Sequence, residues 1–153
     1  NHLTHLYLEL NKITEVGICK LAESKNMESV SLLSLDRNKI GDSGIKHIIE
    51  TENFKNLTHL MVEHNNITDA GIKAISESNN MSNLLRLYLD GNPYTEDGFN
   101  ILGESIFLES LEYPEFEREE AIEEIEEEEE EFEEVEIDDV EEEEDINDDD
   151  NRE

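Results

Sequence analysis

Residues 57–72 read L-T-H-L-M-V-E-H-N-N-I-T-D-A-G-I, and this stretch decides the fold. Leu60 and Val62 are separated by one residue, and such alternation is typical of a short strand with one buried face. Farther along, Ile72 and Ile75 are three residues apart, which is the spacing of an apolar stripe on a helix. The stretch therefore predicts a strand, a turn and the beginning of a helix.

The same pattern recurs along the chain with a constant period of 27 residues. An asparagine follows each predicted strand: Asn11, Asn38, Asn65 and Asn92. A glycine column keeps the same register: Gly17, Gly44, Gly71 and Gly98. A single unit of this kind cannot bury its apolar stripe alone, so it must stack on its neighbours. The sequence predicts four stacked units, with parallel strands in one layer and helices in the other.

Each predicted junction between strand and helix has its own polar chemistry. The asparagine amides are expected to bond to the backbone of their own and the adjacent unit. Thr14, Thr68 and Thr95 can cap the helices, and Gly41 takes their place in the second unit. The acids that follow, such as Asp69, suit the positive end of the helix dipole. We interpret the glycine column as structural turn residues and not as a phosphate-binding loop.

Both ends of the stack depart from the pattern. A fifth strand could begin at Leu111, but Pro114 and Glu119 replace the expected Leu and Asn, so the stack should end there. We expect an apolar cap made of Ile106, Phe107, Leu108, Tyr113 and Phe116. At the other end no cap precedes Leu3, and we expect a chain truncated at its N-terminus.

Charge divides the chain into two parts near Pro114. Residues 1–114 hold 17 acids against nine Lys and Arg, a net charge of −8. Residues 115–153 hold 26 acids against two arginines, a net charge of −24, and have almost nothing to bury. A segment of that composition cannot fold alone. We therefore expect a repeat domain over 1–114, with a degenerate C-terminal cap, and an acidic, largely disordered tail over 115–153.

The signature L-x-x-L-x-L-x-x-N-x-I-T-D-A-G-I, traced four times over residues 1–112, resembles the ribonuclease-inhibitor-like class of leucine-rich repeats. This resemblance implies an α/β solenoid, a horseshoe with parallel strands on its concave face and helices on its convex face. Such repeats with an acidic tail also resemble the Ran GTPase-activating protein family and, more distantly, the acidic leucine-rich nuclear phosphoproteins. The resemblances imply protein binding; the alternatives are a GTPase-activating regulator of a Ran-like small GTPase and an acidic nuclear histone-binding protein.

Outward positions of the strands would line the concave face and supply its contacts. Four of these positions form an acidic column: Glu9, Asp36, Glu63 and Asp90. A basic partner would relieve the repulsion between them, while a purely solubilising role is the alternative. Aromatic residues, Met and Arg, which are enriched at protein interfaces, lie beside the column. The predicted partner-binding residues are Tyr7, Glu9, Asp36, Arg37, Met61, Glu63, Arg86, Tyr88 and Asp90.

The sequence favours an interaction scaffold over an enzyme. No residue pair specifies a nucleophile with its base, and His5 and His59 are two units apart, too far to share a metal ion. We therefore expect no catalytic residue, no cofactor and no metal site. The net charge of −32 argues against direct binding of nucleic acid. The sequence also lacks an apolar run long enough to cross a membrane.

The remaining expectations concern partners and compartment. The single cysteine, Cys19, excludes an internal disulfide framework and suits a reducing compartment. We expect a monomer in the cytoplasm or nucleus that binds a protein partner, such as a small GTPase or a basic protein of the histone type. The tail would engage or screen basic partners, or serve solubility alone.

Overall fold

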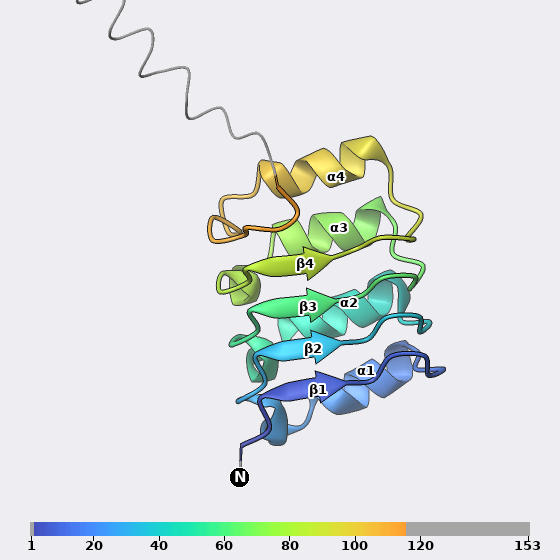
Figure 1. Cartoon of the computed structure of the whole chain (residues 1–153), viewed down its shortest axis with the longest axis vertical. Helices are drawn as coiled ribbons and strands as arrows, with labels where there is room; N and C mark the ends of the chain where they lie inside the picture. Colours follow the sequence, from blue (N-terminus) through green and yellow to red (C-terminus); the bar gives the residue numbers. More distant parts are fainter. Residues whose placement is uncertain (1, 116–153) are drawn as a thin grey trace, which may run out of the picture. The chain divides into compact units, whose positions relative to one another are not determined.

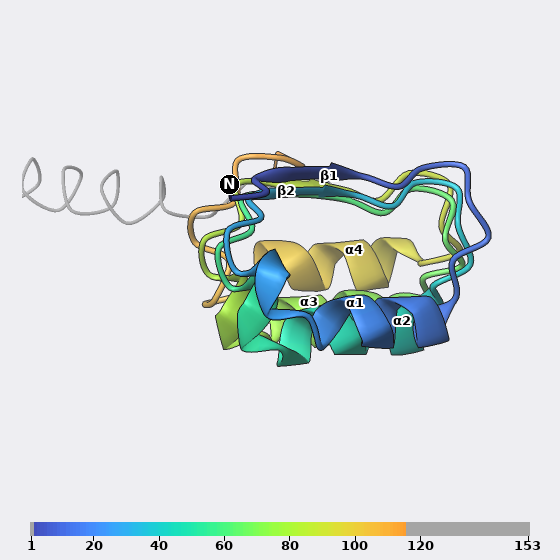
Figure 2. The ribbon, with the colours of Figure 1, turned by 90° about the horizontal axis from the view of Figure 1, so that it is seen from below.

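The computed structural model describes residues 2–115, which form a stack of four strand–helix units (Figure 1). The strands are β1 (His5–Tyr7), β2 (Leu32–Ser34), β3 (His59–Met61) and β4 (Arg86–Tyr88). The helices are α1 (Glu15–Ala22), α2 (Gly41–Glu50), α3 (Asp69–Ser76) and α4 (Glu96–Gly103). The strands pair in parallel in the order β1-β2-β3-β4. The helices form a second layer on one face of the sheet, which confirms the predicted α/β solenoid (Figure 2).

The core lies between the two layers and repeats with the period of the sequence. Leu33, Leu60 and Leu87 are aligned across the strands, and their side chains are buried. Ile45 and Ile72 cover them from the helices and are also buried. This continuity of burial from unit to unit is what stabilises a solenoid, because no unit has a core of its own.

Three short 3-10 helices, which the sequence analysis did not predict, connect the helices to the next strands. They are η1 (Lys25–Met27), η2 (Glu52–Phe54) and η3 (Asn79–Met81). Each ends on a buried apolar side chain that belongs to one column of the repeat: Met27, Phe54 and Met81. A three-residue turn is too short to give a periodic signal, so its apolar residue was visible in the sequence but its conformation was not.

The asparagine column joins neighbouring units as expected. The Asn65 amide nitrogen donates to the carbonyls of Leu35, in the preceding unit, and Glu63, at 2.9 Å each. Its amide oxygen accepts the N–H of Ile40 at 3.4 Å. Asn11 is exposed and, among residues 2–115, bonds only to the carbonyls of Leu8 and Glu9 in its own unit. The buried amides therefore satisfy backbone groups that the turns leave unpaired.

The expected threonine caps form at two of the three sites. The hydroxyls of Thr68 and Thr95 accept backbone N–H groups at the starts of α3 and α4, at 3.2 Å each. Thr14 makes no such bond at the start of α1. Gly41 replaces the threonine with a left-handed backbone, φ +59°, which suits glycine better than any other residue.

The interpretation of the glycine column as turn residues was wrong, because all four glycines lie inside the helices. The need for glycine is steric. A Cβ at Gly71 would collide with the Asp42 carboxylate of the preceding unit, and one at Gly98 would collide with the Asp69 carboxylate. Glycine thus leaves room for an acid that reaches across from the neighbouring unit.

The C-terminal end differs in part from the predicted cap. Leu108 and Leu111 are buried, and Tyr113 forms a single parallel bridge with Arg86 of β4. Ile106, however, is 74% exposed, so its inclusion in the cap was wrong. Ile106 lies in the irregular segment after α4, where the apolar period no longer tells which side chains turn inward. Phe116 lies outside the described residues.

Candidate partner-binding face

The outer face of the sheet carries the predicted columns in the expected register. Strand pairing places Ser34 opposite both Tyr7 and Met61, and Met61 opposite Tyr88. Tyr7 is 58% exposed, whereas Met61 and Tyr88 are half-buried. These three large side chains and one small one form the column that we name the apolar column: Tyr7, Ser34, Met61 and Tyr88.

The acidic column, Glu9, Asp36, Glu63 and Asp90, lies just past the strand ends. Backbone bonds continue the ladder there, from the N–H of Arg37 to the Glu63 carbonyl at 2.8 Å and from that of His64 to the Asp90 carbonyl at 2.9 Å. The residues that follow the acids adopt left-handed backbone, φ +56° at Arg37 and +52° at His64. The acids are therefore held in line although they stand at a turn.

Asp36 differs from the other acids of the column because it has a structural bond. Its Oδ1 accepts the backbone N–H of Glu63 at 2.8 Å. Burial raises the pKa of the Asp36 carboxyl above its ordinary value, the Glu63 N–H opposes that rise, and the charge of Glu9 adds to it. By contrast, the side chains of Glu63 and Asp90 make no hydrogen bond or ion pair with residues 2–115.

The two predicted arginines have different surroundings. Arg37 is exposed at the turn beside Asp36, and its charge helps to lower the pKa of that carboxyl. Arg86 forms a long ion pair with Glu112, with 3.8 Å between Nη2 and Oε2. Tyr88 likewise packs on Tyr113, with 4.8 Å between ring centroids. The sequence analysis missed both contacts because Glu112 and Tyr113 lie in the degenerate fifth unit, where the columns could not be aligned.

Ser34 is a residue of this face that the sequence analysis did not select as a site. Its side chain is fully buried although it belongs to the outward column, because large residues flank it on both sides. The hydroxyl lies close enough to Asp36 to lower the pKa of that carboxyl, yet it has no partner in hydrogen-bonding geometry within the described residues. A small residue between two large ones gives no periodic signal that could have marked it.

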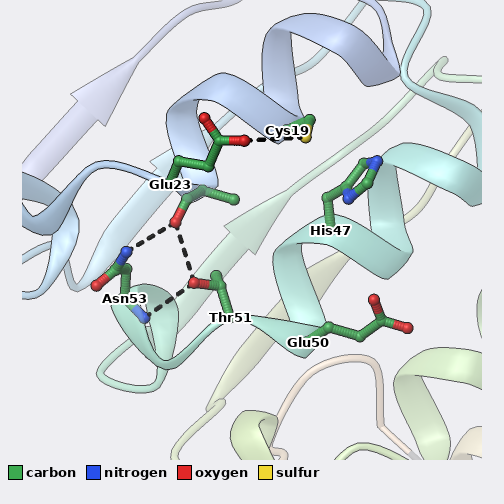
Figure 3. Close-up of a pocket in the computed structure, with 7 residues that line it drawn as sticks. Cys19, Glu23, His47, Glu50, Thr51 and Asn53 are labelled. Carbon is green, nitrogen blue, oxygen red and sulfur yellow. Dashed lines mark hydrogen bonds between the residues drawn. The ribbon is translucent and has the colours of Figure 1, made fainter.

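A shallow groove on the helix layer, lined by residues of α1, α2 and η2, has a structural explanation (Figure 3). The Ala22 carbonyl at its floor accepts bonds from the Thr51 hydroxyl at 3.0 Å and the Asn53 amide at 2.7 Å. The next unit repeats this pattern, since Ser78 and Asn80 both donate to the Ile49 carbonyl. The groove therefore lies at one of the repeated sets of hydrogen bonds that connect neighbouring units.

Cys19, at the edge of the groove, is a free and partly buried cysteine. Its thiol lies 3.7 Å from one carboxylate oxygen of Glu23 (Figure 3). The other oxygen of Glu23 pairs with Lys20 at 2.8 Å. The Lys20 hydrogen bond lowers the pKa of Glu23, and both side chains are exposed. Among residues 2–115, no three His, Cys, Asp or Glu side chains come together as a metal site would require.

Comparison with known families finds the repeat in three of the four units. The profile of the family described as Leucine Rich repeat matches residues 1–22, 27–48 and 55–76. The chain carries leucine-rich repeats. The fourth unit, β4 with α4, is not matched, and there Pro93 and Tyr94 replace the Asn-Ile of the preceding unit. Leucine-rich repeats generally mediate interactions between proteins and typically act without catalysing a reaction.

Two further findings accompany the match. No curated protein matches the chain at a significant level. Within residues 2–115, none of the helices has the length and apolar character needed to cross a bilayer.

Proposed function

We propose that this leucine-rich repeat domain is a binding module whose outer sheet face docks a basic segment of a protein partner. The observation that supports this most is the partly exposed acidic column beside an apolar column, because the two offer charge and contact area at one place. The residues that contact the partner would be those predicted from the sequence: Tyr7, Glu9, Asp36, Arg37, Met61, Glu63, Arg86, Tyr88 and Asp90. The role is binding, and no catalytic step is assigned to the chain.

Electrostatics support a basic partner over a neutral one. Neighbouring strands are about 4.8 Å apart, so each pair of adjacent carboxylates is opposed by roughly 1 kcal/mol in water. Lys and Arg of a partner would replace this repulsion by attraction. Glu63 and Asp90 have no competing partner among residues 2–115, which leaves their charges available.

Histones are one class of basic partner that fits this chemistry, and the resemblance to acidic leucine-rich nuclear phosphoproteins favours them. A Ran-like GTPase is the class that the other resemblance would favour, but no particular residue of this face supports it. The acids of 115–153 would add attraction of their own for any basic partner, and salt would weaken it.

The test uses the full chain and charge reversal at two sites. The variant Glu63→Lys with Asp90→Lys should weaken binding of a Lys-rich probe peptide by on the order of tenfold or more at about 0.15 M salt. The matched control, Glu50→Lys with Glu104→Lys, changes the net charge equally at exposed positions of the helix layer. Residues 115–153 supply the same background in both variants. Equal loss of affinity in both would refute a specific face.

Methionine methyl groups provide the second readout. Met61 is half-buried on the outer face, whereas Met27 and Met81 are buried in the core. On titration with the peptide, the ¹³C-methyl signal of Met61 should move and those of Met27 and Met81 should stay. Binding that leaves Met61 unmoved would place the peptide elsewhere.

A further inference from the structure

We infer that the segment bound on this face is an amphipathic α-helix that lies across the strands, along the acidic column. The inference rests on the proposed function and adds the form of the partner. It also assigns a contact to Ser34, which lies between Tyr7 and Met61 in the apolar column.

The spacing of the acidic column favours a helix over an extended chain. Its carboxylates recur once per strand, about every 4.8 Å, because each repeat moves the chain over by one strand. One stripe of a helix presents a side chain about every 5.4 Å, whereas same-side residues of an extended chain are about 6.6 Å apart. Over three steps the helix overshoots the column by about 1.8 Å and the extended chain by about 5.4 Å. Flexible Lys and Arg side chains absorb the first mismatch more easily than the second.

The two columns together match the two stripes of such a helix. The apolar and acidic columns are two residues apart along each unit, which is about 6.6 Å. An amphipathic helix presents an apolar stripe directly beside a charged one, so both columns are covered at once. Tyr7, Met61 and Tyr88 would contact the apolar stripe of the partner helix. Glu63 and Asp90 would pair with its basic stripe.

Ser34 provides an independent sign that the face is incomplete. Its hydroxyl is buried and lies close to the Asp36 carboxyl, yet it makes no hydrogen bond of good geometry within residues 2–115. It lies beside Asp36, whose carboxyl is partly desolvated. Tyr7, beside Ser34 on β1, is 58% exposed. A Lys or Arg from the helix that enters between Tyr7 and Met61 would donate to the Ser34 hydroxyl and pair with Asp36.

The experiment compares two peptides with equal charge on the full chain. The first spans about four helical turns, with Lys at every third or fourth position and Leu beside it. The second is the same peptide with two central residues replaced by proline, which interrupts a helix. The first should bind on the order of tenfold or more tightly, move the Met61 methyl signal, and show helical Cα shifts when it is isotope-labelled. Ser34→Ala should weaken the first peptide several-fold and leave the second unchanged.

The outcomes distinguish a failure of the helix inference from a failure of the proposed function. If both peptides bind equally and both move Met61, the face binds basic chains but the helix inference is overturned. If neither moves Met61, the proposed function fails, and the inference fails with it. Undiminished binding of the helical peptide to Ser34→Ala would overturn the contact at Ser34.

Discussion

Two sets of carboxylates recur in this molecule, and the chain uses them differently. Those in the first turns of the helices, Asp42 and Asp69, are bound by the next unit. The Asp42 oxygens accept the backbone N–H and hydroxyl of Thr68 at 2.8 and 2.7 Å, and Asp69 holds Thr95 in the same way. Those past the strands, such as Glu63, have side chains without such bonds among residues 2–115.

The difference teaches that the number of acids does not tell how many are available to a partner. The acids past the strands lie two residues before each asparagine of the column and the acids of the helix turns lie four residues after it, and both positions hold aspartate or glutamate in every unit. The two sets differ in whether the neighbouring unit supplies a hydrogen-bond donor. A threonine of the next unit donates to Asp42 and to Asp69. Among the acids past the strands, only Asp36 accepts such a bond within residues 2–115, from the Glu63 N–H. Asp42 and Asp69 connect neighbouring units, whereas Glu63 and Asp90 make no such bond within residues 2–115 and are the acids that we propose a partner contacts.

The largest expected effect concerns the glycine that makes room for the first set. Gly71→Ala should lower the free energy of unfolding by about 2 kcal/mol, because the new Cβ collides with Asp42 and with Ile67. Urea unfolding of the full chain, followed by circular dichroism, measures the change.

Gly17→Ala is the matched control for that substitution. Among residues 2–115, a Cβ there meets only the Ile13 side chain, at 3.0 Å. The gain in helix propensity, up to about 1 kcal/mol, should offset this contact and leave the stability nearly unchanged. Equal losses at Gly17 and Gly71 would contradict the role given to Asp42.

A smaller effect should separate the two sets of acids directly. Asp42→Ala removes both acceptors of Thr68 and should lower the free energy of unfolding by about 1 kcal/mol. Glu63→Ala should change it by less than about 0.5 kcal/mol, because that side chain holds nothing in place. If Glu63→Ala costs as much as Asp42→Ala, the acids past the strands are structural too, and the binding face loses its main support.

The sequence allowed much of this fold to be predicted, because the period of 27 residues fixes strand, turn and helix at once. The asparagine seam followed from the same period, since a buried amide at a strand end must find backbone partners. The bonds from Asp42 to Thr68 could not be predicted, because a helix dipole explains an acid in the first turn equally well. The short 3-10 helices and the orientation of Ile106 were missed because neither belongs to a long periodic segment.

The candidate face could be predicted only in its register. Strand alternation placed Tyr7, Met61 and Tyr88 on one side, and the pairing of the strands agrees. The contacts of each side chain could not be predicted, because they involve residues outside the aligned positions of the repeat. Arg86 forms an ion pair with Glu112, which follows the last regular unit. Ser34 is buried because large side chains flank it, although serine itself is polar. Which of these residues bind a partner remains a prediction.

Asp36 shares a feature with each set, because it belongs to the acidic column and also accepts a structural hydrogen bond. Its titration gives the smallest and most specific test. Its pKa is raised in the folded state, so the folded chain holds this proton more firmly than the unfolded chain. The contribution of Asp36 to stability is therefore greatest below its ordinary pKa and falls as the pH rises through the raised value. Asp36→Asn keeps an acceptor for the Glu63 N–H but carries no charge.

The Asn variant should accordingly be slightly more stable than the parent chain at neutral pH, by less than about 0.5 kcal/mol, with the gain shrinking toward pH 3. Urea unfolding of both chains across this range measures the difference, and the carboxylates they share contribute equally to both. Asp36→Ala, which leaves the Glu63 N–H without its acceptor, should instead be less stable by about 1 kcal/mol. A gain for Asn that grows toward low pH would mean that the fold stabilises the Asp36 carboxylate, and it would move Asp36 from the binding face into the structural set.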